Sequence, residues 1–291
     1  MIGLPGTDRR SAVLGGAAVL ATAGIAALTG SSAAHRSVVA TAPDIRSESV
    51  FSRARGQYVD LVLILPSERP AHGLPMVTML HARGGSARGA APNGMARYLS
   101  QAVATGRVPP FGLAAVDGGP YAYWHESDPG DDPMAMLLEE LPVWLADHGL
   151  GDDSGHPFAA AGTSMGGFGA LVYTRRRRER GRPLAATGVL APALLTDWEE
   201  MREREAFRDR RAWAALDPLR HPETLDGTPL GVWCGTSDPF VAGTRRFVRR
   251  ADPDVAVFSD GGHTGDFYTS AMPGLVAFLG RHTPIPAEPR T

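Results

Sequence analysis

The chain has 291 residues, of which 43% are hydrophobic and 21% charged, so it suits one large globular domain or two small ones rather than a disordered or collagen-like polypeptide. Its 29 basic and 31 acidic residues give a formal net charge of -2, which argues against a cationic surface for nucleic acid or an anionic membrane. The chain contains no lysine and a single cysteine, Cys234, which excludes lysine Schiff-base chemistry, an internal disulfide and a multi-cysteine metal site.

The first 34 residues have the pattern of an export signal. Arg9 and Arg10 precede an uncharged stretch rich in Ala, Gly, Val and Leu, which ends in a run of small residues suited to cleavage. The paired arginines resemble a twin-arginine signal. An uncleaved membrane anchor is the alternative, because about 20 apolar residues can just span a bilayer. We therefore predict a signal at 1–34, a single domain at 35–291, and a secreted or cell-envelope location.

Patterns of strands and helices alternate along the rest of the chain. After a polar lead-in, apolar runs of strand length occur at 58–65, 75–80, 111–116, 157–161, 187–190, 230–235 and 255–259. Helical spacing occurs at 95–105, 137–145, 166–173 and about 267–279. Strands separated by helices predict an α/β fold with a mostly parallel central sheet and helices on both faces.

Two segments between these strands carry further predictions. In the helix at 137–145, the spacing places Glu139 and Glu140 on the solvent side and Val143 partly inward. The segment 196–226 is rich in Arg, Glu and Trp and precedes the strand at 230–235, so it predicts a helical insertion or a long surface connection.

The segment Gly162-Thr163-Ser164-Met165-Gly166 has the G-x-S-x-G pattern of a nucleophile elbow. It follows a short strand of small residues and precedes a helix, and its glycines allow the chain to turn sharply there. In such a turn the serine hydroxyl projects above the edge of the sheet. Ser164 is therefore the candidate nucleophile, and an ordinary Gly/Ser turn is the alternative.

A serine nucleophile requires a base and an acid that orients the base. In this fold they should follow later strands, in the order acid and then histidine. Asp238 directly follows the strand at 230–235, and His263 follows the strand at 255–259 through a Gly-Gly turn. His81 and His125 are the competing histidines. Asp260 is the competing acid, although it lies in the same turn as the histidine and is poorly placed to orient it.

The segment His81-Ala82-Arg83-Gly84-Gly85 ends the strand at 75–80, and its glycines would let backbone N–H groups approach a ligand. Ester hydrolysis passes through an oxyanion that two fixed N–H donors stabilise. We assign these donors to Arg83 and to Met165, the residue after the nucleophile. A glycine-rich turn without a catalytic role is the alternative.

Aromatic residues follow the third strand at the carboxyl edge of the sheet, where open α/β sheets bind ligands. Tyr123, Trp124 and His125, together with His81, are the candidate substrate-binding residues. Packing of a surface loop is an equally good explanation for the aromatic residues.

Several stretches resemble the esterase D group of α/β-hydrolases, which includes feruloyl-type esterases and secreted mycolyltransferases. They cover most of 35–291 and read VDLVLILP, LHARGG, EELPVWL, GTSMGGFGA, CGTSDPF and GGHTGDFY. The resemblance implies an α/β-hydrolase fold in which Ser164 is the nucleophile, Asp238 the acid and His263 the base. It also implies the same two oxyanion donors. The chain departs from the group at Ala82, where these esterases usually have glycine.

The leading functional prediction is a secreted serine hydrolase that cleaves a carboxylic ester through an acyl-serine intermediate and needs neither cofactor nor metal. Its partner would be a small-molecule ester or an acylated sugar. We expect no nucleic-acid ligand and no stable membrane contact after signal cleavage. An acyltransferase that uses a sugar hydroxyl as acceptor shares the same first half-reaction. A hydrolase fold kept as a non-catalytic binding module is the non-enzymatic alternative.

Overall fold

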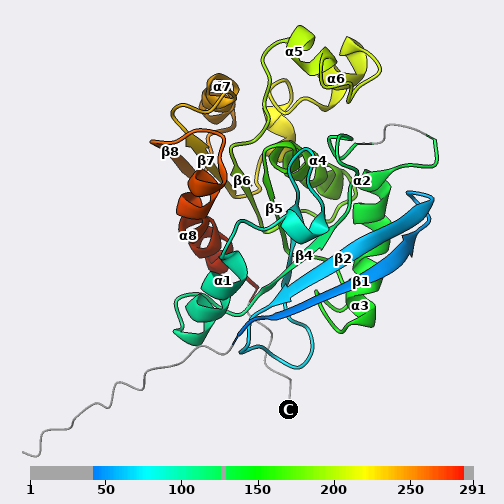
Figure 1. Cartoon of the computed structure of the whole chain (residues 1–291), viewed down its shortest axis with the longest axis vertical. Helices are drawn as coiled ribbons and strands as arrows, with labels where there is room; N and C mark the ends of the chain where they lie inside the picture. The colour runs from blue at the N-terminus through cyan, green and yellow to red at the C-terminus, as the bar shows by residue number, and fades with distance from the viewer. Residues whose placement is uncertain (1–41, 126–128, 285–291) are drawn as a thin grey trace, which may run out of the picture. The chain divides into compact units, whose positions relative to one another are not determined.

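The computed structural model describes residues 42–125 and 129–284, and the predicted export signal lies outside them. The described residues form an eight-stranded sheet in the order β1-β2-β4-β3-β5-β6-β7-β8 (Figure 1). The strands are β1 (Asp44–Ser52), β2 (Gln57–Leu65), β3 (Met76–Leu80), β4 (Gly112–Val116), β5 (Ala159–Thr163), β6 (Ala186–Leu190), β7 (Leu230–Gly235) and β8 (Val255–Ser259). The β1–β2 and β2–β4 pairs are antiparallel and the other pairs are parallel, which confirms the predicted mostly parallel sheet.

The first strand is a correction to the sequence analysis, which treated its residues as a polar lead-in. β1 pairs with β2 along its whole length, from Asp44 opposite Leu65 to Ser52 opposite Gln57. It is an edge strand whose side chains are mostly exposed, so it lacks the apolar run that marks a buried strand.

Helices cover both faces of the sheet (Figure 1). On one face, α1 (Met95–Ala104) packs against α8 (Gly265–Arg281), and α8 lies over β6 and β7. On the other face lie α4 (Met165–Glu179), α3 (Leu141–Asp147) and α7 (Val241–Ala251). Each layer buries its own apolar cluster against the sheet. Burial of both faces explains why the inner strands are continuous apolar runs.

The helix expected at 137–145 has a different geometry. It follows the single-turn α2 (Pro133–Ala135) and begins as a π-helical turn, η2 (Met136–Glu140), before α3. A π turn inserts a residue, so later side chains rotate to another face. Val143 is 56% exposed rather than inward. The Glu140 carboxylate accepts hydrogen bonds from the Ser52 hydroxyl and the Arg53 amide at 2.5 and 2.8 Å, so it joins this helix to the β1–β2 turn instead of facing solvent.

The segment before β7 contains short helices, in agreement with the predicted helical insertion. They are α5 (Trp198–Arg202), α6 (Arg210–Leu216) and the 3₁₀ turn η3 (Pro222–Leu225). Both α helices begin at an aspartate: Asp197 accepts from the Glu199 amide at 2.6 Å, and Asp209 accepts from the Ala212 amide at 2.7 Å. The insertion lies above α4 in Figure 1.

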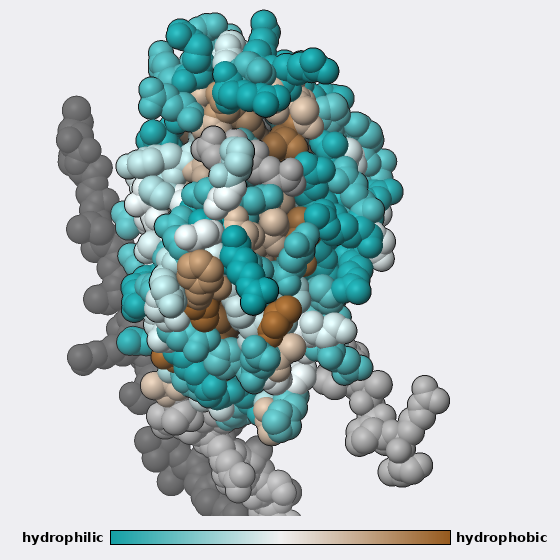
Figure 2. Space-filling model, turned by 90° about the vertical axis from the view of Figure 1, so that its right-hand side faces the viewer, coloured by the Kyte–Doolittle hydropathy of each residue, from teal (hydrophilic) through white to brown (hydrophobic). Residues whose placement is uncertain are grey.

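The surface carries only small apolar areas on the side shown in Figure 2, where brown patches are separated by hydrophilic residues. The loop that follows β3, from His81 to Ser86, is called the β3 loop, and it leads into the 3₁₀ turn η1 (Ala87–Gly89). None of the helices in the described part of the chain combines the length and hydropathy that a membrane span requires.

Candidate active site

The G-x-S-x-G segment forms a tight turn between β5 and α4. Ser164 has φ +56° and ψ −117°, a conformation that non-glycine residues rarely adopt. A Cβ on Gly162 would lie 2.1 Å from the Gly166 carbonyl oxygen, and a Cβ on Gly166 would lie 2.0 Å from the Leu80 carbonyl oxygen. Both glycines are therefore required by backbone packing, and the strained turn carries the serine hydroxyl to the carboxyl edge of the sheet.

Three side chains that are far apart in the sequence lie in hydrogen-bond distance at this edge. His263 Nε2 is 2.8 Å from Ser164 Oγ, and His263 Nδ1 is 2.7 Å from Asp238 Oδ2. The Asp238 side chain has no exposed surface, and its Oδ1 accepts a hydrogen bond from the Phe240 amide at 2.8 Å. A carboxylate at Nδ1 favours a proton on that nitrogen, so the Nε2 lone pair faces the serine hydroxyl.

The competing residues occupy other positions. His125 Nε2 is 2.6 Å from the Ala206 carbonyl oxygen, and its ring stacks on Phe207 at 4.2 Å. His81 Nδ1 is 2.9 Å from the Ala82 carbonyl oxygen. Asp260 is exposed. None of these three predicted alternatives forms a hydrogen bond to the Ser164 side chain within the described residues.

Two backbone amides lie in the segments expected to bind an oxyanion. Met165 begins α4, where the first N–H groups of a helix have no intrahelical acceptor. Arg83 lies in the loop after β3, and among the described residues no backbone acceptor takes its amide hydrogen. The adjoining Gly84 amide donates to the Pro120 carbonyl at 2.7 Å. Ala82 does not have a positive φ, so the Cβ at this position of the loop causes no left-handed backbone strain.

The predicted substrate-binding residues lie in the interior rather than on an open surface. His81 and Trp124 have 0% exposed surface, Tyr123 has 1% and His125 has 6%. Tyr123 and Trp124 have φ values of +52° and +59°, so the backbone turns in the left-handed region at both positions. Burial of all four side chains indicates that they pack in the interior of the protein. His81 and Trp124, which have no exposed surface, are therefore not placed to contact a substrate.

Two aromatic residues that the sequence analysis did not select pack against the imidazole of His263. The rings of Phe240 and Tyr268 contact it at centroid distances of 5.0 and 5.6 Å, at interplanar angles of 83° and 90°. Burial and the nearby Asp238 carboxylate raise the pKa of Tyr268. Proximity in sequence was the available signal, since Phe240 follows Asp238 and Tyr268 lies one turn into the helix after His263.

The described part of the chain contains no group of three or more His, Cys, Asp and Glu side chains arranged to hold a metal ion. Cys234 is buried in β7, and burial raises the pKa of its thiol to about 11. A thiol with that pKa is protonated at neutral pH and is a poor nucleophile.

Comparisons with known proteins agree with this fold. A family model described as "Putative esterase" matches residues 52–247. A ferulic acid esterase structure is similar with a TM-score of 0.67 and 18% identity, covering 83% of this chain and 100% of that one. An S-formylglutathione hydrolase from Agrobacterium tumefaciens has a TM-score of 0.65 and 16% identity, covering 84% and 96%. Mycobacterium tuberculosis MPT51 has a TM-score of 0.63 and 18% identity, covering 83% and 99%. A sequence search of curated proteins finds no match.

Proposed function

The chain belongs to the esterase family, and we propose that this carboxylic-ester hydrolase cleaves its substrate through an acyl intermediate on Ser164. The single observation that carries this proposal is the continuous hydrogen-bonded arrangement of Ser164, His263 and Asp238, with distances of 2.8 and 2.7 Å. The strained backbone of the serine supports it, because such strain persists where function requires it.

In the acylation step, Ser164 Oγ attacks the ester carbonyl carbon while its proton passes to His263 Nε2. The buried Asp238 carboxylate stabilises the imidazolium that forms. The amides of Met165 and Arg83 donate to the negatively charged carbonyl oxygen of the tetrahedral intermediate. Collapse of that intermediate breaks the bond to the alcohol, which leaves with the proton from His263.

In the deacylation step, a water molecule replaces the alcohol. His263 takes a proton from the water, whose oxygen attacks the acyl carbon. The second tetrahedral intermediate then collapses: the bond from the acyl carbon to Ser164 Oγ breaks, the free acid leaves, and Ser164 Oγ takes the proton back from His263. A sugar hydroxyl in place of water would turn hydrolysis into acyl transfer. Product analysis with added glycerol or trehalose separates the two outcomes, because transfer yields a new acylated alcohol and hydrolysis yields only the free acid.

Labelling with a fluorophosphonate probe tests the nucleophile. The wild-type protein should be labelled at Ser164, and should hydrolyse p-nitrophenyl esters, whereas Ser164→Ala should lose both properties while its thermal unfolding stays close to that of the wild type. Ser237→Ala is a suitable control, because Ser237 lies in the adjoining acid-bearing loop. Full esterase activity in Ser164→Ala would disprove the proposed mechanism. Failure of the wild type to react with probe or ester would favour a non-catalytic binding module.

For the substrate, we propose a small-molecule ester or an acylated sugar. The support for this class is the similarity in fold to a ferulic acid esterase, at 18% sequence identity. A series of p-nitrophenyl esters of increasing acyl length, together with methyl ferulate, would define the acyl preference. Equal rates across the series would contradict a shaped acyl site.

We also propose that residues 1–34 direct export. The support is the Arg9–Arg10 pair followed by a weakly apolar, uncharged stretch and small residues. Replacing both arginines with lysine should retain the full-length precursor inside the cell, while the wild-type mature protein should begin at Ala34 or His35. An intact N-terminus on membrane-bound wild-type protein would instead establish an uncleaved anchor.

A further inference from the structure

The imidazole of His81 is fully used by backbone groups. Nε2 accepts a hydrogen bond from the Gly118 amide at 3.1 Å, and Nδ1 lies 2.9 Å from the Ala82 carbonyl oxygen. Because an amide can only donate and a carbonyl can only accept, His81 must be neutral with its proton on Nδ1. Its side chain therefore ties the loop after β3 to the loop after β4.

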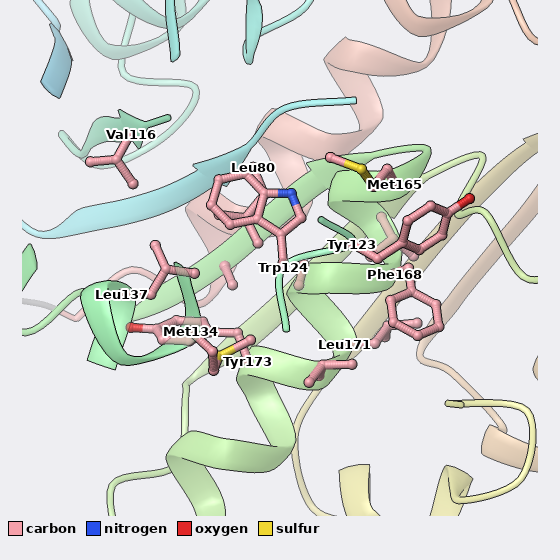
Figure 3. Packing of buried hydrophobic residues seen from close by; sticks show 14 of the residues in the cluster. Leu80, Val116, Tyr123, Trp124, Met134, Leu137, Met165, Phe168, Leu171 and Tyr173 are labelled. Atoms are coloured by element: carbon pink, nitrogen blue, oxygen red, sulfur yellow. The ribbon is translucent and has the colours of Figure 1, made fainter. Parts of the chain in front are cut away.

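Trp124 packs between the β3 loop and α4. Its indole Nε1 donates to the His81 carbonyl at 3.3 Å, and its ring lies 4.8 Å from the His81 ring. A Cβ on Gly118 would come within 2.3 Å of the indole, and a Cβ on Gly169 of α4 would come within 2.5 Å of it. Figure 3 shows Trp124 among residues of α4 and the end of β3. The indole thus contacts the elements that carry both candidate oxyanion donors.

The position of the β3 loop is determined from the β4 side by further bonds. The Gly84 amide donates to the Pro120 carbonyl at 2.7 Å. The Asp117 carboxylate accepts from the Ala87 amide at 2.6 Å and from the Asp60 amide at 3.1 Å. The Arg83 amide lies between His81 and Gly84, both of which are hydrogen-bonded to the loop after β4. Its placement relative to α4 depends on the direct packing of Leu80 and His81 against Gly166, and on Trp124, which joins the loop after β4 to α4.

We propose that Trp124 and His81 are positioning residues that set the separation of the Arg83 and Met165 amides in the oxyanion hole. This inference rests on the proposed ester hydrolysis and assigns these two residues a role other than substrate contact. An oxyanion hole stabilises the transition state only when both donors point at the place where charge develops. A change at Trp124 or His81 should therefore weaken transition-state binding more than ground-state binding.

Trp124→Phe tests the proposal because it removes the Nε1 donor and keeps an aromatic ring. Loss of an oxyanion donor lowers kcat by about 100- to 1,000-fold, and we expect a smaller decrease of about 10- to 100-fold for a displaced donor, with KM changed by less than about twofold. The Ki of an aryl trifluoromethyl ketone should rise by the same factor as kcat/KM falls, because its adduct with Ser164 carries an oxyanion.

Trp213→Phe is the matched control. Trp213 is equally buried, in the insertion, and its Nε1 has no hydrogen-bond acceptor within the described residues. The same substitution there removes an indole nitrogen without breaking a bond to the β3 loop. Its kcat and its Ki for the ketone should equal those of the wild type.

Variants of His81 and Gly118 give independent tests. His81→Leu removes both hydrogen bonds, whereas His81→Gln places an amide oxygen where Nε2 accepts from Gly118 and should recover part of the lost kcat. Gly118→Ala should displace the indole without deleting it, and Gly89→Ala is its control because a Cβ there meets no atom within 4 Å. All variants are compared well below their melting temperatures.

The outcomes separate this inference from the proposed function. If Trp124→Phe and His81→Leu are less stable but keep wild-type kcat and ketone Ki, these residues serve folding alone and the inference is wrong. A rise in KM at constant kcat would assign them to substrate binding and would also contradict it. If Trp124→Phe or His81→Leu does not fold, the kcat and ketone Ki of Gly118→Ala and His81→Gln test the inference in their place. If instead Ser164→Ala keeps full activity, the proposed function itself fails, whatever these variants do.

Discussion

Substitution of Asp238 by asparagine should disable the enzyme through the orientation of His263. The carboxylate accepts from His263 Nδ1 at 2.7 Å and from the Phe240 amide at 2.8 Å, and its side chain has no exposed surface. An asparagine that keeps its oxygen on Phe240 presents its NH₂ group to the imidazole. Nδ1 must then accept, the proton moves to Nε2, and no lone pair faces Ser164 Oγ.

The expected decrease in kcat is about 10⁴-fold, which corresponds to an increase of about 5.5 kcal/mol in the activation free energy. The substitution changes the size and shape of the side chain very little. Initial rates with p-nitrophenyl butyrate at several pH values would measure it. Asp260→Asn is the matched control, because it removes the same charge three residues before His263 from an exposed position. It should leave kcat within about twofold, as expected for an exposed surface residue. Equal losses in the two variants, or a larger loss at Asp260, would refute the reasoning.

Three further predictions concern buried groups. Gly166→Ala places a Cβ 2.0 Å from the Leu80 carbonyl oxygen and should reduce the free energy of unfolding by about 3 kcal/mol or more, measured by urea denaturation; an unchanged midpoint would contradict the packing argument. Burial lowers the pKa of His81 below its ordinary 6.5; the nearby Arg55 adds to this effect and Asp117 opposes it. The unfolded state therefore binds more protons than the folded state, and the free energy of unfolding should decrease as the pH falls below 6.5. His81→Gln should reduce this slope in thermal unfolding, leaving the part contributed by His156, whose pKa is also lowered, and an unaltered slope would contradict the assignment. Cys234, with its pKa raised to about 11, should react with a thiol reagent at pH 8 only after unfolding; rapid reaction of the native protein would show that the thiol is accessible.

The buried strands could be predicted from sequence because burial on both faces leaves a continuous apolar run. The predicted range 230–235 coincides with β7, which is buried throughout. The predicted range 255–259 coincides with β8, an edge strand with exposed and half-buried side chains whose residues are nevertheless mostly apolar. β1 could not be found this way, since its residues are mostly polar and exposed and it is recognised by its pairing with β2. The same limit applies to Glu140, whose hydrogen bonds join residues 88 positions apart in the sequence at their longest.

In the candidate site too, some features could be predicted from the sequence and others could not. Ser164, Asp238 and His263 each follow a strand, and parallel strands bring their carboxyl ends to one edge, so their proximity could be predicted from chain order. The burial of His81 and Trp124 could not. It depends on left-handed backbone at Tyr123 and Trp124 and on close approach to Gly118, which hydrophobic periodicity does not encode.

The most direct test of the account is the mass of the intact enzyme during turnover. Rapid acid quenching of the wild-type protein with a slowly deacylated ester should yield a protein heavier by one acyl group, with the added mass on the peptide that contains Ser164. The Ser164→Ala variant should show neither the adduct nor turnover. Steady turnover of both proteins without any acylated peptide would contradict covalent catalysis by this serine.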